Sequence, residues 1–338
     1  GDVYKRQLLM ALTRGGTCQA TNPAGSEEDM KTPILTTKFY IPALRAETVV
    51  RPRLLADLES GWGRKLVLVS APAGFGKTSL LSEWVRGQMA REDVDFCWLT
   101  LEQSEDSPRR FWRYFIHGLQ AVRPNLGVAA LQILEGSEVS NERLLTVLIN
   151  EMTKWSRSLV MVLDDYHVIG SQEIHAGMAF LVEHLPVQAH LVLATRVDPP
   201  WNLGRLRAQE KLLELRQSDL RFTQEEAMCF LNQSMGLGLE TEAVSALERR
   251  TEGWIAGLQM AAISMRGRED RTGFIQSFTG SHRFVLDYLL EEVLDQQPLE
   301  VREFLLRTSI LERLNGSLCD AVMLSLIHIS EPTRLRRI

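Results

Sequence analysis

A chain of 338 residues is too long for one minimal domain and indicates two or three packed units. Its composition, 45% hydrophobic, 24% charged and 7% aromatic, excludes collagen-like, low-complexity and mostly disordered chains. The formal net charge of −5, without a basic tract in the body of the chain, argues against unaided binding to nucleic acid. The four cysteines form no C-x-x-C pair, so we expect neither a disulfide framework nor a zinc knuckle, and a reducing, cytoplasmic setting fits best.

The apolar stretches of the chain are short. The longest, residues 253–265, has 13 residues, whereas a helix needs about 20 to cross a bilayer. The apolar run at 8–12, which follows Lys5-Arg6, is also too short for an export signal. We therefore expect no export signal and no membrane partner.

In the body of the chain, short apolar runs alternate with segments of helical periodicity. Such alternation predicts an α/β fold with a parallel sheet covered by helices on both faces. The expected strands are 65–70, 96–101, 159–163 and 190–195, and the expected helices are 78–91, a helix that begins at Pro108, 144–155 and 174–185.

The pattern changes after Phe222. Thr223-Gln-Glu-Glu226 has the form of a capping box, in which a helix begins. Helical periodicity then dominates, and no further strand is predicted. The expected helices are 224–235, 241–250, 254–266, 283–295 and 299–307.

Ala71-Pro-Ala-Gly-Phe-Gly-Lys-Thr78 fits the phosphate-loop pattern G-x-x-x-x-G-K-[ST], except that Ala71 replaces the first glycine. It lies between a predicted strand and a predicted helix. Gly74 and Gly76 let successive N–H groups turn toward a β-phosphate, and the helix N-terminus adds its dipole. Lys77 is expected to bridge the β- and γ-phosphates, and the Thr78 hydroxyl to coordinate Mg²⁺. The expected nucleotide-binding residues of this loop are Ala71, Pro72, Ala73, Gly74, Phe75, Gly76, Lys77, Thr78 and Ser79.

The apolar strand predicted at 159–163 ends in two acids, Asp164 and Asp165. Ligands of such folds bind at the carboxyl ends of the strands, so this strand brings its terminal carboxylate close to the phosphate loop. We expect Asp164 to hold Mg²⁺ through water and Asp165 to orient or deprotonate the attacking water. Asp165 and Lys77 are the expected catalytic residues. An apolar strand that ends in two aspartates is common by chance, and the prediction depends on the phosphate loop.

Several arginines are further candidates for the site. Arg196 ends the next predicted strand and is expected to contact a γ-phosphate; alternatively it is a solvated residue that opens a loop. Arg51 is expected near the base or ribose, as is Arg53, and a surface role is the alternative for both. The basic stretch at 205–221 is interpreted as the solvated face of a helix, or as a contact to phosphates or to a neighbouring domain. The histidines between 167 and 190 lack the spacing of a helical zinc pair, so we expect no zinc site.

These motifs resemble, in order, those of the MalT-type STAND ATPases, which form the N-terminal part of large ATP-binding LuxR-family transcriptional regulators. The resemblance is carried by APAGFGKT at 71–78, FCWLTL with EDSPRRFWRYF at 96–115, and LVMVLDDYH at 159–167. It continues through LRFTQEEA at 220–227, TEGWIAGLQMAA at 251–262 and FLLRTSILERLNGSLCDAV at 304–322, so that it covers about 290 residues.

The resemblance implies an α/β P-loop NTPase, an all-helical region and the start of a winged-helix domain. The expected parts are a lead-in at 30–65, a nucleotide-binding domain at 66–222, a helical domain at 223–282 and a truncated winged-helix domain at 283–322.

The two ends differ from the body. GDVYKRQ at the start and LSLIHISEPTRLRRI at the end resemble translated sequencing-adapter read-through. Residues 13–29 are polar and without periodicity, whereas Met30 with the following KTPILTTKFYIP resembles a natural start. We therefore expect residues 1–29 to be non-native or disordered and residues 323–338 to be an adapter artefact. The natural product is expected to continue beyond Val322.

The function that the resemblance implies is a switch with ATP, ADP and Mg²⁺ as cofactors. ADP holds a closed monomer, inducer and ATP favour an open form that self-associates and activates transcription, and a weak regulatory ATPase activity resets it. DNA and a small-molecule inducer are expected to bind only through domains beyond this chain. Two alternatives remain: a STAND ATPase coupled to another effector, such as a kinase or defence effector, and a nucleotide-binding scaffold with negligible hydrolysis.

Overall fold

The computed structural model describes residues 32–45, 48–136, 141–268, 270–278, 283–294 and 299–309, with 311, 316, 318, 319 and 321–323. The expectations for residues 1–29 and for 324–338 lie outside this part of the chain. Among the described residues, no helix has both the length and the apolar character that a membrane span requires.

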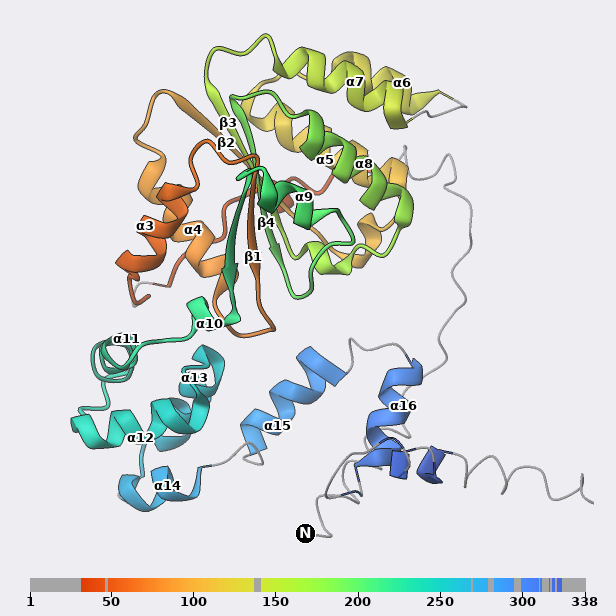
Figure 1. The fold of residues 1–338 in the computed structure, drawn as a ribbon. Helices are drawn as coiled ribbons and strands as arrows, with labels where there is room; N and C mark the ends of the chain where they lie inside the picture. Colours follow the sequence, from red (N-terminus) through yellow and green to blue (C-terminus); the bar gives the residue numbers. More distant parts are fainter. Residues whose placement is uncertain are drawn as a thin grey trace, which may run out of the picture.

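A five-stranded parallel sheet, in the order β2-β3-β4-β1-β5, forms the centre of the fold (Figure 1). The central strands are almost wholly buried, which explains their continuous apolar sequences. The four predicted strands are confirmed, and β5 was not predicted because its glutamate and arginine interrupt the apolar pattern. The strands are β1 (Leu66–Ser70), β2 (Val94–Thr100), β3 (Ser158–Asp164), β4 (Ala189–Thr195) and β5 (Leu212–Arg216).

Helices cover both faces of the sheet, as predicted (Figure 1). The face with α3 and α4 has one apolar core, and the face with the helices α5 to α9 has another, built around Phe111, Trp112 and Phe115. The first group is α3 (Pro52–Ser60) and α4 (Lys77–Gln88). The second is α5 (Pro108–Val122), α6 (Val128–Glu135), α7 (Asn141–Met152), α8 (Gln172–His184) and α9 (Leu203–Ala208).

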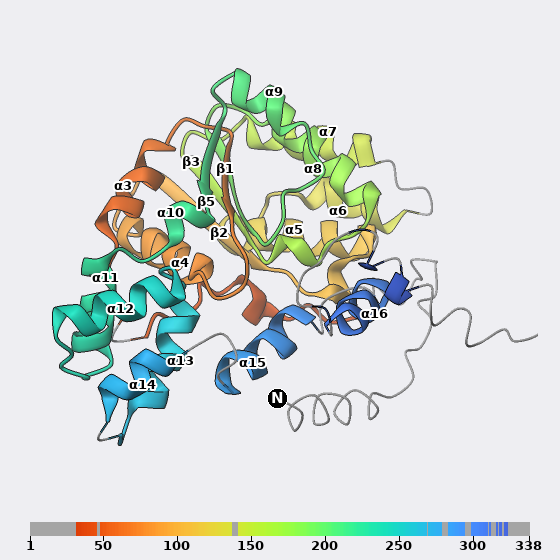
Figure 2. The same cartoon turned by 60° about the horizontal axis from the view of Figure 1, so that its bottom comes forward.

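A helical region follows the sheet and has a third core of its own (Figure 2). Its helix α11 begins at the predicted capping box, in which the Thr223 hydroxyl accepts from Glu226 N and the Glu226 carboxylate accepts from Thr223 N. The elements are α10 (Gln217–Leu220), α11 (Gln224–Met228), the π-helical turn η4 (Cys229–Ser234), α12 (Thr241–Thr251), α13 (Ile255–Met265), α14 (Arg271–Ser277), α15 (Arg283–Leu289), the π-helical turn η5 (Leu290–Leu294) and α16 (Leu299–Thr308).

The interpretation of 205–221 as one helical face is wrong. This stretch contains the end of α9, the whole of β5 and α10. Its arginines are paired with acids: Arg207 with Glu214, Arg216 with Asp198 and Glu214. In the sequence, alternating arginines and acids on an edge strand resemble the solvated face of a helix. Only the three-dimensional structure shows which acid each arginine pairs with.

The lead-in is fixed to the sheet by a buried acid. Glu105 ends the turn η2 (Gln103–Glu105), has no exposed surface, and accepts from Lys38, Ser104 and Arg110. We expect Glu105→Ala to lower the free energy of unfolding by about 3 kcal/mol, because the buried Lys38 and the half-buried Arg110 lose their carboxylate partner. Its neighbour Glu102, whose side chain is 64% exposed, is the matched control, and Glu102→Ala should cost about 1 kcal/mol or less. Urea unfolding measures both, and equal losses would contradict this role of Glu105.

Candidate functional site

The loop between β1 and α4 has the strained backbone that the glycines of the motif predict. Gly74 and Gly76 have φ of 78° and 72°, and Gly76 is the N-cap of α4. A Cβ at Gly74 would lie 2.6 Å from the Ala256 Cβ and 2.7 Å from Trp254 Nε1, so side chains are excluded on steric grounds as well. The 12-residue helix α4 begins in this loop, so its first N–H groups lie beside the loop backbone. The loop in turn closely contacts the helical region.

Lys77 is buried at the first position of α4, with 7% of its surface exposed. Its ammonium donates to two carbonyls of its own loop, Ala71 O at 2.8 Å and Pro72 O at 3.0 Å. Burial lowers the pKa of Lys77 to about 8, although the carboxylates of Asp165 and Asp164 oppose the shift. Among the described residues, the hydrogen bonds of this ammonium go to these loop carbonyls, so an anion in the loop would be a stronger partner.

Two carboxylates at the end of β3 face the same loop. The Thr78 hydroxyl donates to Asp164 Oδ1 at 3.1 Å, and Asp164 is 1% exposed. Burial, together with the adjacent Asp165 carboxylate, raises the pKa of Asp164 to about 7. Burial likewise raises the pKa of Asp165, against the effect of Lys77. A carboxylate and a hydroxyl oxygen in contact are a donor set that suits Mg²⁺, which also takes phosphate and water oxygens.

Asp165 has a left-handed backbone, with φ of 58° and ψ of 36°, and its side chain is 40% exposed. It opens the turn η3 (Tyr166–Val168), which carries His167. The His167 Nδ1 lies 3.8 Å from Asp165 Oδ1, and burial lowers the pKa of His167 to about 4. Of these two side chains, Asp165 is the more exposed and is the one that lines the cavity beside the phosphate loop.

Arg196 follows β4, which lies between β1 and β3. Its guanidinium donates to Glu292 O at 2.5 Å and to Glu292 Oε2 at 2.9 Å. The phosphate loop, Asp165, Arg196, Tyr288 and Glu292 together line a cavity of about 270 Å³. No sequence motif indicates Tyr288 of α15 or Glu292 of η5, because only the fold brings this segment to the phosphate loop.

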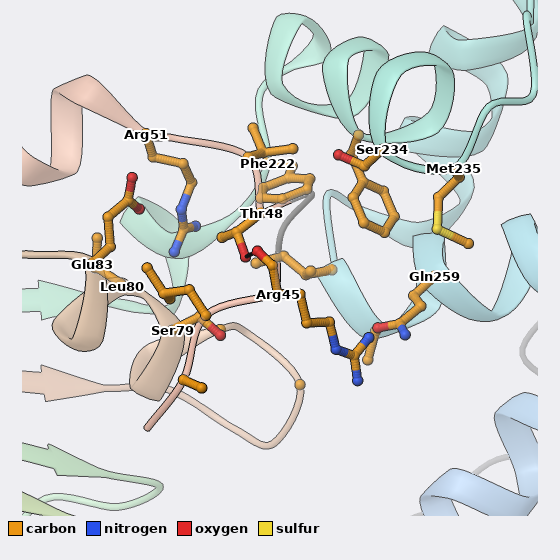
Figure 3. Close-up of a pocket in the computed structure, with 18 of the residues that line it drawn as sticks. Arg45, Thr48, Arg51, Ser79, Leu80, Glu83, Phe222, Ser234, Met235 and Gln259 are labelled. Atoms are coloured by element: carbon orange, nitrogen blue, oxygen red, sulfur yellow. Dashed lines mark hydrogen bonds between the residues drawn. The ribbon is translucent and has the colours of Figure 1, made fainter. Parts of the chain in front are cut away.

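A larger cavity of about 470 Å³ adjoins the smaller one and shares Gly74, Gly76, Ser79 and Tyr288 with it (Figure 3). It lies between the lead-in, the start of α4 and the helical region, and its volume is in the range of small-molecule sites. The labelled residues come from all three parts: Arg45, Thr48, Arg51, Ser79, Leu80, Glu83, Phe222, Ser234, Met235 and Gln259. Of these labelled residues, the sequence pointed to Arg51 and Ser79.

The structure separates Arg51 from Arg53. Arg51 is 4% exposed, lines the larger cavity, donates to Leu220 O at 2.9 Å and lies over the Phe222 ring. Burial lowers the pKa of Arg51 to about 10. Arg53 does not line the cavity. It donates to the Glu226 carboxylate and to the carbonyls of Asp219 and Arg221, so it ties α3 to the helical region.

The other predicted loop residues differ in their positions. Ala73, Gly74, Gly76, Lys77, Thr78 and Ser79 line the smaller cavity, and Gly74, Gly76 and Ser79 also line the larger one. Ala71 and Pro72 contribute carbonyls to Lys77, whereas Phe75 is 5% exposed and packs in the core under α4. Asp164 lies below Thr78 and lines neither cavity.

Two hydrogen bonds join the loop directly to α13. The Trp254 indole N–H donates to Ala73 O at 3.0 Å, and Ala256 N donates to Gly74 O at 3.1 Å. Gly253, with φ of 68°, accepts from Phe222 N, and a Cβ there would lie 2.7 Å from Phe222 O. The helical region therefore contacts the backbone of the phosphate loop itself.

Comparisons with known proteins agree with the resemblance. Residues 290–325 match the family model of the MalT winged helix domain. The HTH-type transcriptional regulator MalT of Serratia proteamaculans is 34% identical over 290 residues, which is 84% of this chain and 31% of that protein. The serine/threonine-protein kinase PknK of Mycobacterium tuberculosis is 32% identical over 311 residues, which is 92% of this chain and 27% of PknK. The chain thus spans less than a third of the length of either relative.

Solved structures give lower similarity. A STAND protein with a tetratricopeptide repeat sensor from Pyrococcus horikoshii has a TM-score of 0.46 and 17% identity. The match covers 88% of this chain and 41% of that protein's chain. The Aeropyrum pernix Orc1 protein in complex with DNA has a TM-score of 0.47 and 16% identity, over 88% and 81%. Both TM-scores are below 0.5, so the sequence relatives, the strand order and the phosphate loop carry the assignment. Over the 290 aligned residues the chain is homologous to the transcriptional regulator MalT, and it has a P-loop NTPase fold, a helical region and residues that match the MalT winged helix domain.

Proposed function

We propose that this chain is a nucleotide-dependent switch that binds ADP or ATP with Mg²⁺ and hydrolyses ATP slowly. The observation that carries the proposal is the shared loop: Ala73 and Gly74 belong to the phosphate loop, and their carbonyls accept from Trp254 and Ala256 of the helical region. A phosphate bound by this loop would act on the sheet and on the helices together. A switch also requires that the nucleotide bind two conformations unequally, since equal affinity shifts no equilibrium.

The roles follow from position and chemistry. The backbone of Ala71–Ser79 would cradle the phosphates, with Lys77 as their cation. Thr78 and Asp164 would hold Mg²⁺, which neutralises phosphate charge when bound. Asp165 would orient and deprotonate water, and Arg196 would contact the γ-phosphate once its partner releases it. The larger cavity, with Arg51 in its wall, would take the nucleoside.

The output of the switch is proposed from the relatives. MalT is named as a transcriptional regulator, and the winged-helix match points in the same direction, so we favour transcriptional regulation by a cytoplasmic protein. Contacts to DNA and to an inducer would lie in other domains. PknK is named as a kinase and matches the same region, so a kinase output is the second candidate. The switch itself would be common to both.

Sedimentation velocity tests the switch. We expect the chain to sediment as a compact monomer with ADP and Mg²⁺, and to expand or self-associate when ATPγS, a slowly hydrolysed ATP analogue, replaces ADP. A Lys77→Ala variant should respond to neither nucleotide. An identical sedimentation profile with both nucleotides bound to the wild-type chain would contradict a switch.

Nucleotide affinity is expected to fall as the pH rises above about 8, the pKa to which burial lowers Lys77. Below this pH the ammonium is charged before the nucleotide arrives. Above this pH, Lys77 must take up a proton when the nucleotide binds, because a bound phosphate raises the pKa of Lys77 again. The Kd for ADP should therefore rise by up to about tenfold per pH unit above pH 8. Calorimetric titrations at several pH values measure this, and a Kd that stays constant would contradict the role of Lys77.

A further inference from the structure

The contact between Arg196 and Glu292 crosses from the sheet to the segment that matches the winged helix domain. Glu292 lies in η5, within the matched residues 290–325. It accepts from both terminal nitrogens of Arg196, once through its carbonyl and once through its carboxylate. A π-helical turn is a rare element that is frequently found at functional sites. This one places a carboxylate on the wall of the smaller cavity.

The charges around this cavity are balanced without a ligand. Two cations, Lys77 and Arg196, and two exposed or half-buried carboxylates, Asp165 and Glu292, form its wall. The Glu292 carboxylate acts on the cavity in two ways. It pairs with the Arg196 guanidinium, which a terminal phosphate would need. It also places a negative charge beside the position where that phosphate would add further negative charge. Both effects disfavour a third phosphate, whereas the loop backbone and Lys77 remain available for the first two.

Tyr288 supports the same placement from the preceding turn. Its hydroxyl oxygen would lie 2.9 Å from a Cβ at Gly74, so it lies directly over the loop, and its ring contacts the Trp254 ring at 5.6 Å between centroids. The segment 288–292 is therefore held against the phosphate loop at two points, Tyr288 on the loop and Glu292 on Arg196. A ligand that displaces Glu292 must also move this segment.

We propose that Glu292 is the residue that makes this conformation selective for a nucleoside diphosphate over a triphosphate, by holding Arg196 and by placing a carboxylate beside the terminal-phosphate position. This inference rests on the proposed nucleotide function of the same site. Arrival of a γ-phosphate would exchange the Glu292 carboxylate for phosphate oxygens on Arg196 and release η5. Glu292 is thus a specificity-determining residue supplied by the winged-helix segment.

Isothermal titration of the 338-residue chain with ADP and with ATPγS, both in Mg²⁺, tests the proposal. The wild-type chain should bind ADP more tightly. Glu292→Gln should lower the Kd for ATPγS by about tenfold, equivalent to about 1.4 kcal/mol, and leave the Kd for ADP within about twofold. Glu291→Gln, an exposed acid on the same turn, is the matched control and should leave the ratio unchanged.

A second change separates the role of Arg196 from simple repulsion. In an Arg196→Gln background, Glu292→Gln should change the Kd ratio by less than about threefold, because no guanidinium remains to be released. The Glu292 side chain is 45% exposed, so Glu292→Ala is a second variant that should fold and give the same shift.

The outcomes distinguish this inference from the function on which it rests. If the wild-type chain binds both nucleotides but Glu292→Gln changes both Kd values equally, or neither, the inference is overturned and the proposed function stands. A full tenfold shift in the Arg196→Gln background would overturn the part assigned to Arg196. If the wild-type chain binds neither nucleotide, both the proposed function and the inference fail.

Discussion

Replacing Lys77 by alanine is expected to weaken ADP binding about 100-fold or more. The ammonium is buried, and in the described part of the chain it donates only to the carbonyls of Ala71 and Pro72. Phosphate oxygens would therefore gain a charge-assisted donor that water has not saturated. Hydrogen bonds to charged groups contribute about 1.5–3 kcal/mol each, and two of them account for a loss of this size. Calorimetric titration with ADP and Mg²⁺ measures the effect directly.

Lys65→Ala is the matched control for Lys77→Ala. Lys65 precedes β1, at the opposite end of the strand, and donates to Glu183 O instead of to the phosphate loop. Its loss should leave the Kd for ADP within about twofold of that of the wild-type chain. Binding of ADP to Lys77→Ala within about threefold of the wild-type affinity, in a variant with an unchanged thermal unfolding profile, would contradict the assigned phosphate site.

Asp165→Asn is expected to slow ATP hydrolysis by about 100-fold or more while ADP affinity stays within about threefold. A positioned general base contributes about 10²–10⁴-fold to the rate, and asparagine keeps the shape of the side chain but cannot accept the proton. The left-handed backbone of Asp165 is a conformation that asparagine also adopts readily, so the fold should be preserved. Single-turnover release of phosphate from labelled ATP gives the rate without the step of product release.

Asp93→Asn is the control for this rate. Asp93 lies at the exposed opposite end of the sheet, where it pairs with Arg91, and its loss should not change hydrolysis. A wild-type rate that Asp165→Asn reproduces would show that another group activates water. A wild-type chain that binds ATP but releases no phosphate above the uncatalysed rate would favour the scaffold alternative over a hydrolysing switch.

The sheet could be predicted because its signals are local. β1, β3 and β4 are buried on both faces, so each is a continuous apolar run, and the phosphate loop follows the first of them in the expected strand–loop–helix order. β5 was not predicted because it is an edge strand that contains the charged residues Glu214 and Arg216, which form ion pairs. Its apolar residues are too few and too scattered to show a period of two.

The residues that form the site were harder to predict from the sequence than the sheet was. Local motifs brought attention to Lys77, Thr78 and Asp164, and the structure places Thr78 in contact with Asp164. The partner of Arg196 lies 96 residues later in a helical segment without any motif, so no local pattern could indicate it. Arg51 and Arg53 are two residues apart and had the same interpretation in sequence, yet of the two only Arg51 lines the larger cavity, because Arg51 is the non-helical N-cap of α3 whereas Arg53 lies in its first turn.

Amide hydrogen exchange of the wild-type chain, with and without ADP and Mg²⁺, is the most direct test of a nucleotide site shared by the phosphate loop and the helical region. ADP should slow exchange in 73–79 and, at the same ADP concentration, in 254–259, because these segments are joined by hydrogen bonds and line the same cavity. Protection of 73–79 alone would contradict the coupling between the sheet and the helices. Protection confined to the separate cavity of about 360 Å³ around Trp201 and Lys211 would contradict the site itself.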